Sequence, residues 1–138
     1  MEVRFSKTYI ERLFHSGDVH ELCSIIDTIS KLRALPERLW LAQRLYAWCC
    51  WSEYGISQYY EALSQEDYIN ILEALTRYGL DELADRYRSG MEIETGTSDK
   101  LHRDLNNWLE DHDNEITAIC LDLISGDIHS LGSECGNI

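Results

Sequence analysis

The sequence has a single proline, eight glycines and no long apolar run among its 138 residues. A transmembrane helix needs about 20 consecutive apolar residues, so we expect no membrane span. The first residues also lack the apolar centre of a signal peptide, which predicts a cytoplasmic protein. With 44% hydrophobic and 27% charged residues, the composition is typical of a globular chain. We therefore expect one folded domain over residues 1–138.

Motifs for catalysis and metal binding are also missing. The chain has no Gly-x-Ser-x-Gly, no phosphate-binding glycine loop, no His-Glu-x-x-His and no Cys-x-x-Cys. The densest His and carboxylate cluster is Asp111, His112, Asp113 and Glu115. On a helix these side chains point in several directions, so they predict a solvated acidic surface and not a metal site. We expect no enzymatic activity, no metal and no cofactor.

The cysteines do not form a disulfide framework. There are five, an odd number, and Cys49 is adjacent to Cys50. Cys23, Cys49, Cys50 and Cys120 lie in apolar stretches, which predicts small buried hydrophobic side chains. Cys135 lies in a glycine-containing tail and is expected to carry the exposed thiol.

Positive charge is scarce in the second part of the chain. Residues 1–50 contain six acids and seven bases, whereas residues 51–138 contain nineteen acids and five bases. Such a one-sided field favours a cationic partner and argues against direct binding of nucleic acid or an anionic membrane. The acids predicted to form the partner-binding surface are Glu61, Glu66, Asp67, Asp81, Asp85, Asp104, Glu110, Asp111, Asp113 and Glu115.

Several of these acids have the spacing of neighbours on a helix. Asp81 and Asp85 are four apart, as are Asp111 and Glu115, and Glu110 precedes Asp113 by three. Such like-charged pairs destabilise a helix by about 0.2–0.5 kcal/mol each. Two other acids are each expected to pair with a base four residues later, Glu82 with Arg86 and Glu73 with Arg77. The pattern is compatible with a surface that maintains solubility or with one that meets a basic cleft.

Hydrophobic periodicity predicts an all-α fold, a single compact bundle of about six or seven helices. Its centre is expected to be the helix over residues 37–53, which contains Trp40, Trp48 and Trp51. Residues 89–98 are predicted to form a loop, and residues 127–138 a flexible tail. The expected helices span residues 6–14, 18–31, 36–53, 64–78, 80–87 and 98–111, with a last one that ends at residue 125.

The segment Tyr54-Gly55-Ile56-Ser57-Gln58-Tyr59-Tyr60 resembles the signature of a bacterial all-helical family. That family is typified by a nineteen-kilodalton DNA-mimic protein, and its pattern is Asn-Gly-Gly-Phe-x-Gln-Tyr-Phe. This chain keeps one glycine, Gln58 and the aromatic pair, and the similarity covers about residues 37–125. We expect the signature to be structural: Gly55 permits a tight junction, Gln58 binds backbone groups there, and Tyr59 or Tyr60 packs with its polar tip exposed. The resemblance implies an acidic protein that occupies the site of a DNA-binding partner.

Charge and resemblance together predict a non-enzymatic inhibitor that acts as a DNA mimic. Its partner would be a basic nucleic-acid-binding protein, such as a transcription factor, a nuclease or a phage-defence (CRISPR) component. One alternative is an immunity-type protein that neutralises a cognate toxin. Another is a small ligand-binding or enzymatic domain with an aromatic pocket near Trp48, Trp51 and Tyr59. The sequence also allows a homodimer.

Overall fold

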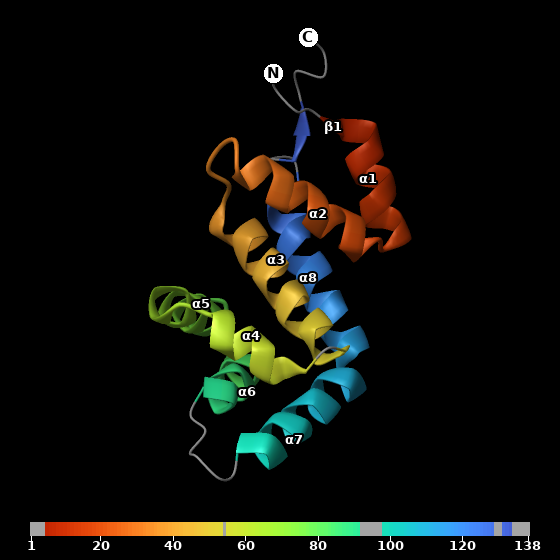
Figure 1. Ribbon diagram of the computed structural model, residues 1–138. Helices are drawn as coiled ribbons and strands as arrows, with labels where there is room; N and C mark the ends of the chain where they lie inside the picture. Colours follow the sequence, from red (N-terminus) through yellow and green to blue (C-terminus); the bar gives the residue numbers. More distant parts are fainter. Residues whose placement is uncertain (1–4, 54, 92–97, 129–130, 134–138) are drawn as a thin grey trace. The chain divides into compact units, whose positions relative to one another are not determined.

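The computed structural model describes residues 5–53, 55–91, 98–128 and 131–133 (Figure 1). Within these residues the chain is helical almost throughout, which confirms the all-α class. The elements are β1 (Phe5–Ser6), α1 (Lys7–Ser16), α2 (Val19–Ser30), α3 (Glu37–Cys50), a 3₁₀-helix η1 (Trp51–Glu53), α4 (Ile56–Ala62), α5 (Gln65–Arg77), α6 (Asp81–Met91), α7 (Ser98–Asp111), α8 (Asp113–Asp127) and β2 (Gly132–Ser133).

The described residues form eight α-helices, more than the sequence predicts. The additional helix is α4, in the segment that carries the family signature. The helix predicted over residues 36–53 ends at Cys50 and continues as the 3₁₀-helix η1. Every helix of the described chain is too short or too polar to cross a lipid bilayer.

The chain divides into two compact units. The first unit comprises residues 1–46 and 115–138, and the second unit comprises residues 47–114. The helices α3 and α8 each contribute residues to both units.

In the first unit, helices α1 and α2 begin where the sequence predicts. Ser6 accepts a hydrogen bond from the Tyr9 backbone N–H, and Asp18 accepts one from Glu21. Such caps satisfy backbone donors that a helix leaves free at its start. The core of the unit consists of aliphatic side chains and two cysteines, and includes Leu22, Cys23, Ile25, Ile26, Ile29, Leu39, Leu41, Leu45, Ile116, Cys120 and Ile124.

The end of the first unit differs from the expected flexible tail where the structure describes it. Leu131 is buried, and β2 pairs in parallel with β1, with Phe5 opposite Gly132. Helix α8 also runs through Gly126 to Asp127, beyond the predicted end at residue 125. The Arg38 side chain lies against Gly126, and its Nε donates to the Leu123 carbonyl oxygen at 3.3 Å.

The second unit contains α4, α5, α6 and α7 around a core in which Trp48 and Tyr87 are fully buried. Helix α5 begins at the predicted cap Ser64 and is followed by Gly79, whose φ of 74° favours glycine. Helix α6 extends to Met91, so residues 89–91 are helical and not part of the predicted loop. Residues 92–97 of that loop lie outside the described residues.

Candidate functional site

The ten predicted surface acids are divided between the two units. Glu115 belongs to the first unit and the other nine belong to the second. All of them are exposed except Asp67, which is half-buried. By sequence, the second unit contains fifteen acids and five bases, a net charge of −10, and the first unit contains ten acids and seven bases, a net charge of −3. The excess negative charge is therefore concentrated in the second unit.

Half of these acids have a structural explanation. Glu66 and Asp67 lie in the first turn of α5, and Asp81 opens α6. Asp113 and Glu115 lie in the first turn of α8. The N-terminal end of a helix carries a partial positive charge, so a carboxylate there is stabilising by about 0.3–1 kcal/mol. The folding of these helices is a sufficient reason for acids at these positions.

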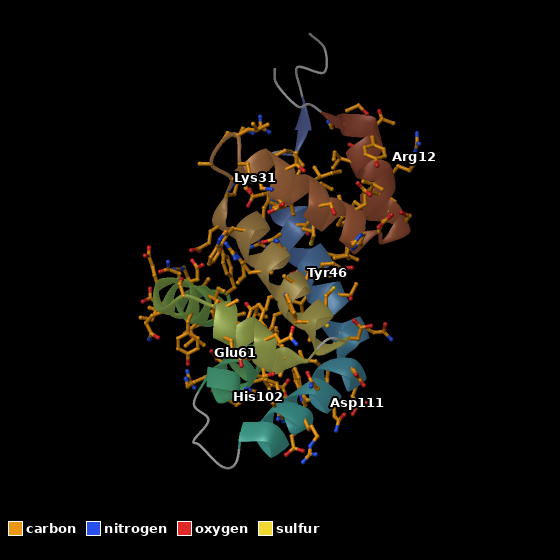
Figure 2. All side chains as sticks on the ribbon, viewed as in Figure 1. Arg12, Lys31, Tyr46, Glu61, His102 and Asp111 are labelled. Carbon is orange, nitrogen blue, oxygen red and sulfur yellow. The ribbon has the colours of Figure 1, made fainter. Side chains whose placement is uncertain are left out.

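Three other acids lie at the C-terminal ends of helices, where the dipole of their own helix disfavours a carboxylate. Glu61 lies in the last turn of α4, and Glu110 and Asp111 are the last two residues of α7. The C-terminal end of a helix carries a partial negative charge, which repels a carboxylate. Neither helix has a basic residue in its last turn. Glu61 and Asp111 are labelled in Figure 2, on α4 and at the end of α7.

The remaining two acids lie within helices. Asp104 is exposed in the middle of α7. Asp85 accepts a hydrogen bond from Arg88 at 3.0 Å, an ion pair on the surface of α6. Its charge is therefore partly compensated, and Asp85 is a weaker candidate for a partner contact than Asp104.

The expected pairing of Glu82 with Arg86 does not occur. The guanidinium carbon of Arg86 lies 5.0 Å from the centre of the Trp108 ring, a cation–π contact. Glu82 and Arg86 form no ion pair in the described part of the chain. The negative charge of Glu82 thus adds to that of Asp81 and Asp85 on the same helix.

The structure separates acids that the sequence places on one helix. His112 interrupts the helical segment, so Glu110 and Asp111 end α7 while Asp113 and Glu115 begin α8. The Nδ1–H of His112 donates to the Trp108 carbonyl oxygen at 2.8 Å, and the two rings stack with centres 4.2 Å apart. Glu110 and Asp113, predicted as neighbours on one helix, therefore belong to different helices, as do Asp111 and Glu115.

Asp113 also contacts the interior of the second unit. Its Oδ1 accepts a hydrogen bond from the Cys49 thiol at 3.5 Å. Cys49, Cys23 and Cys120 are buried, as predicted, whereas Cys50 is half-buried. Cys135 lies outside the described residues.

Part of the segment that resembles the family signature is buried, namely Ile56, Tyr59 and Tyr60. Gly55 has a φ of 107°, a conformation that favours glycine, and immediately precedes α4. The Ile56 backbone N–H donates to Asn106 Oδ1 at 3.1 Å, so α7 caps the start of α4. Gln58 is exposed, so the prediction that it binds backbone groups at this junction is wrong. Asn106 makes that contact instead. Tyr54 lies outside the described residues.

Tyr59 and Tyr60 are buried, and their hydroxyls are buried too. The prediction that one of these hydroxyls is exposed is therefore wrong. The two hydroxyls of Tyr59 and Tyr87 lie 2.6 Å apart, and the Tyr60 hydroxyl donates to the Tyr87 carbonyl oxygen at 2.7 Å. Trp48 Nε1 donates to the Tyr60 hydroxyl at 3.0 Å. Burial raises the pKa of Tyr60 far above its ordinary value, because the phenolate would lose its hydration. Trp48, Tyr59, Tyr60 and Tyr87 are thus linked by hydrogen bonds within the core of the second unit.

In the described chain, no three His, Cys, Asp or Glu side chains are arranged to hold a metal ion. A depression of about 390 Å³ lies on α5 and is lined by Leu72, Glu73, Thr76 and Arg77. It does not include Trp48 or Tyr59, which the sequence proposed as pocket residues.

Sequence reasoning missed Asn106 and the aromatic stack around Trp108. Trp108 and His112 are four residues apart, a spacing that places them on one face of a helix and that offered a usable signal. The Asn106 contact links residues 50 apart, and no local pattern predicts it.

No family model matches this chain, and no curated protein or solved structure matches it either. The resemblance to the DNA-mimic family therefore depends on residues 54–60 and the helices that follow them.

Proposed function

We propose that this protein is a non-enzymatic inhibitor whose acidic surface occupies the nucleic-acid-binding site of a basic partner. The main support is the position of Glu61, Glu110 and Asp111, which are exposed at helix ends where folding disfavours them. Residues that folding does not favour and that remain solvent-exposed are best explained by a contact with another molecule.

Charge supports the choice of partner. The net charge of −10 in the second unit attracts a positively charged groove and repels nucleic acid and anionic lipid. The exposed carboxylates would take the places of phosphates and would accept hydrogen bonds from Lys and Arg side chains. Asp104, Glu110 and Asp111 on α7, with Glu61 on α4, are the residues that we expect to contribute most.

The resemblance of residues 54–60 to the DNA-mimic signature supports the same function. The proposed partner is a transcription factor, a nuclease or a phage-defence component. An immunity-type protein would use the same electrostatics against a toxin. The aromatic-pocket alternative is weaker, because Trp48, Tyr59 and Tyr60 are buried and hydrogen-bonded to one another or to Tyr87. We also propose that the protein is cytoplasmic and that its helices form a single bundle centred on residues 37–53.

The test is capture followed by competition. The wild-type protein is used as bait in an extract of its host, and bound proteins are identified by mass spectrometry. Each captured protein is then purified and loaded with labelled DNA or RNA. We expect the inhibitor to displace the nucleic acid, and we expect its affinity to fall steeply as the salt concentration rises. A partner complex that is insensitive to salt and leaves the nucleic acid bound would contradict the proposal.

A further inference from the structure

The ring of Trp108 on α7 carries a positively charged side chain from α6. The guanidinium carbon of Arg86 lies 5.0 Å from the centre of that ring. Trp108 is half-buried and Arg86 is exposed, so this contact lies at the surface of the second unit. A guanidinium is attracted to the face of an indole and, being planar, can also stack on it. The surface around Trp108 therefore already binds one guanidinium, that of the chain itself.

Two other aromatic side chains hold the Trp108 ring. His112 stacks on it with ring centres 4.2 Å apart and an angle of 18° between the planes. Trp48, which is fully buried, contacts it with ring centres 6.5 Å apart. The ring is thus supported by contacts other than the one with Arg86, and we expect it to keep its place when Arg86 moves away.

Two exposed acids flank Trp108 on α7. Asp104 lies four residues before Trp108, and Asp111 lies three residues after it. At 100° and 1.5 Å per residue, the three residues fall within an arc of about 60° and along about 10.5 Å of the helix. A guanidinium has five N–H donors, so one that lies on the Trp108 ring can also donate to a carboxylate beside it. In the described part of the chain, neither acid forms an ion pair.

Arg86 has a second position available to it. Glu82 is exposed and lies four residues before Arg86 on α6, the spacing of an ion pair on a helix. A cation–π contact and an ion pair at the surface are both weak, so exchanging one for the other costs little. An arginine from another molecule can therefore take the place of Arg86 on Trp108 while Arg86 pairs with Glu82.

We infer that Trp108, Asp104 and Asp111 form a binding site for an arginine side chain of another protein, and that Arg86 occupies this site in the free protein. The site selects arginine over lysine, because an ammonium is a compact charge that cannot stack on the indole. Only the identification of the arginine's owner with the basic partner rests on the proposed function. The site itself is tested with a free peptide, so either proposal can fail without the other.

Binding of a tri-arginine peptide to the isotope-labelled protein tests this site. NMR at about 0.1 M salt follows the indole N–H signal of Trp108, which W108F identifies by its loss. We expect the peptide to shift this signal. In R86A the competing guanidinium is absent, so the dissociation constant of the peptide should fall at least about threefold.

R103A is the matched control, because it removes the same charge from an exposed arginine of α7. It should change the dissociation constant by less than about twofold, since a charge at the surface is screened by salt. A tri-lysine peptide should bind R86A at least about threefold more weakly than tri-arginine does. The triple variant R86A/D104N/D111N should likewise bind tri-arginine at least about threefold more weakly than R86A.

Circular dichroism checks that the variants are folded, which we expect because Arg86, Arg103, Asp104 and Asp111 are all exposed. Failure of about 10 mM tri-arginine to shift the Trp108 signal in R86A would overturn the inference. Equal effects of R86A and R103A, or equal binding of the two peptides, would also overturn it, because either result reduces the contact to a general attraction between charges.

Discussion

The indole Nε1 of Trp48 donates a hydrogen bond to the hydroxyl of Tyr60 at 3.0 Å, and both side chains are buried. Trp48 comes from the end of α3 that belongs to the second unit and Tyr60 comes from α4, so the bond connects these two elements. Tyr60 belongs to the segment that resembles the DNA-mimic signature. Its contacts lie within the core, so this part of the signature serves folding, and the acids elsewhere are the candidates for binding.

Removal of the Tyr60 hydroxyl is expected to destabilise the protein. Tyr60→Phe leaves the buried Trp48 donor without its acceptor, which costs about 1–3 kcal/mol in the free energy of unfolding. Tyr9→Phe makes the same chemical change at a half-buried side chain of the first unit and is expected to stay within about 0.5 kcal/mol of wild type. Urea denaturation measures both. Equal losses in the two variants would show that the buried bond contributes nothing.

Stability is expected to fall at alkaline pH, partly because of Tyr60. Burial raises the pKa of Tyr60 in the folded state, whereas in the unfolded chain it is about 10. Below pH 10 both states hold the proton. Above it the unfolded state releases the proton while the folded state retains it, so unfolding becomes more favourable as pH rises.

Thermal unfolding midpoints between pH 8 and pH 11 measure this effect. The midpoint of Tyr60→Phe should decline less with pH than the midpoint of wild type, and Tyr9→Phe should follow the wild-type slope. Parallel curves for all three proteins would show that Tyr60 does not contribute to the alkaline transition.

Gly90 on α6 makes room for the Tyr60 ring. A Cβ atom at Gly90 would overlap that ring, which is enclosed in the core. Alanine normally stabilises a helix relative to glycine, but Gly90→Ala is expected to destabilise the protein by about 1–3 kcal/mol, the usual cost of overpacking. Gly126→Ala is the comparison, since its Cβ would meet the side chain of Arg38.

The Arg38 side chain is flexible and half-buried and can move aside. Gly126→Ala should therefore change stability much less than Gly90→Ala. Thermal denaturation ranks the two variants, and a Gly90→Ala protein that is as stable as wild type would mean that the Tyr60 ring is not fixed in place.

Asn106 is expected to hold the start of α4. Asn106→Ala removes the acceptor of the Ile56 N–H and should cost about 1 kcal/mol, as the loss of other N-terminal caps does. Gln58→Ala, a neighbouring polar change at an exposed side chain, should remain within about 0.5 kcal/mol of wild type. The reverse order in urea denaturation would support the role that the sequence assigned to Gln58.

The helices and their caps could be predicted because their causes are local. Ser6, Asp18 and Ser64 each cap a helix three residues before the N–H that they bind, a spacing visible in the sequence. The helix break at His112 is near the predicted boundary at residue 111. Contacts between distant residues, such as Asn106 with Ile56 and Tyr59 with Tyr87, have no local signature, and the sequence assigned the roles of Gln58 and the tyrosine tips incorrectly.

The candidate site could be predicted only in part for the same reason. The sequence identifies where acids accumulate, but the significance of an acid depends on where its helix begins and ends. Glu66 and Asp113 stabilise helix starts, whereas Glu61 and Asp111 lie at helix ends. An acid at a helix start can be told from an acid at a helix end only when the boundaries of α4, α5, α7 and α8 are known.

Neutralisation of the three helix-end acids should not weaken folding. In E61Q/E110Q/D111N, carboxylates leave positions that the helix dipole disfavours, so the free energy of unfolding should be equal to or higher than that of wild type. The control E11Q/D27N/D122N removes the same charge from exposed acids of the first unit and breaks only the surface pair Asp27–Lys31, which contributes little.

Competition between these two variants is the most direct test of the proposed function. Each is titrated against the captured partner loaded with labelled nucleic acid, at fixed salt. We predict that E61Q/E110Q/D111N loses at least about tenfold in inhibition, while E11Q/D27N/D122N inhibits as the wild type does. If both variants lose inhibition equally, or if the helix-end variant retains it, the acids at the ends of α4 and α7 are not the binding surface.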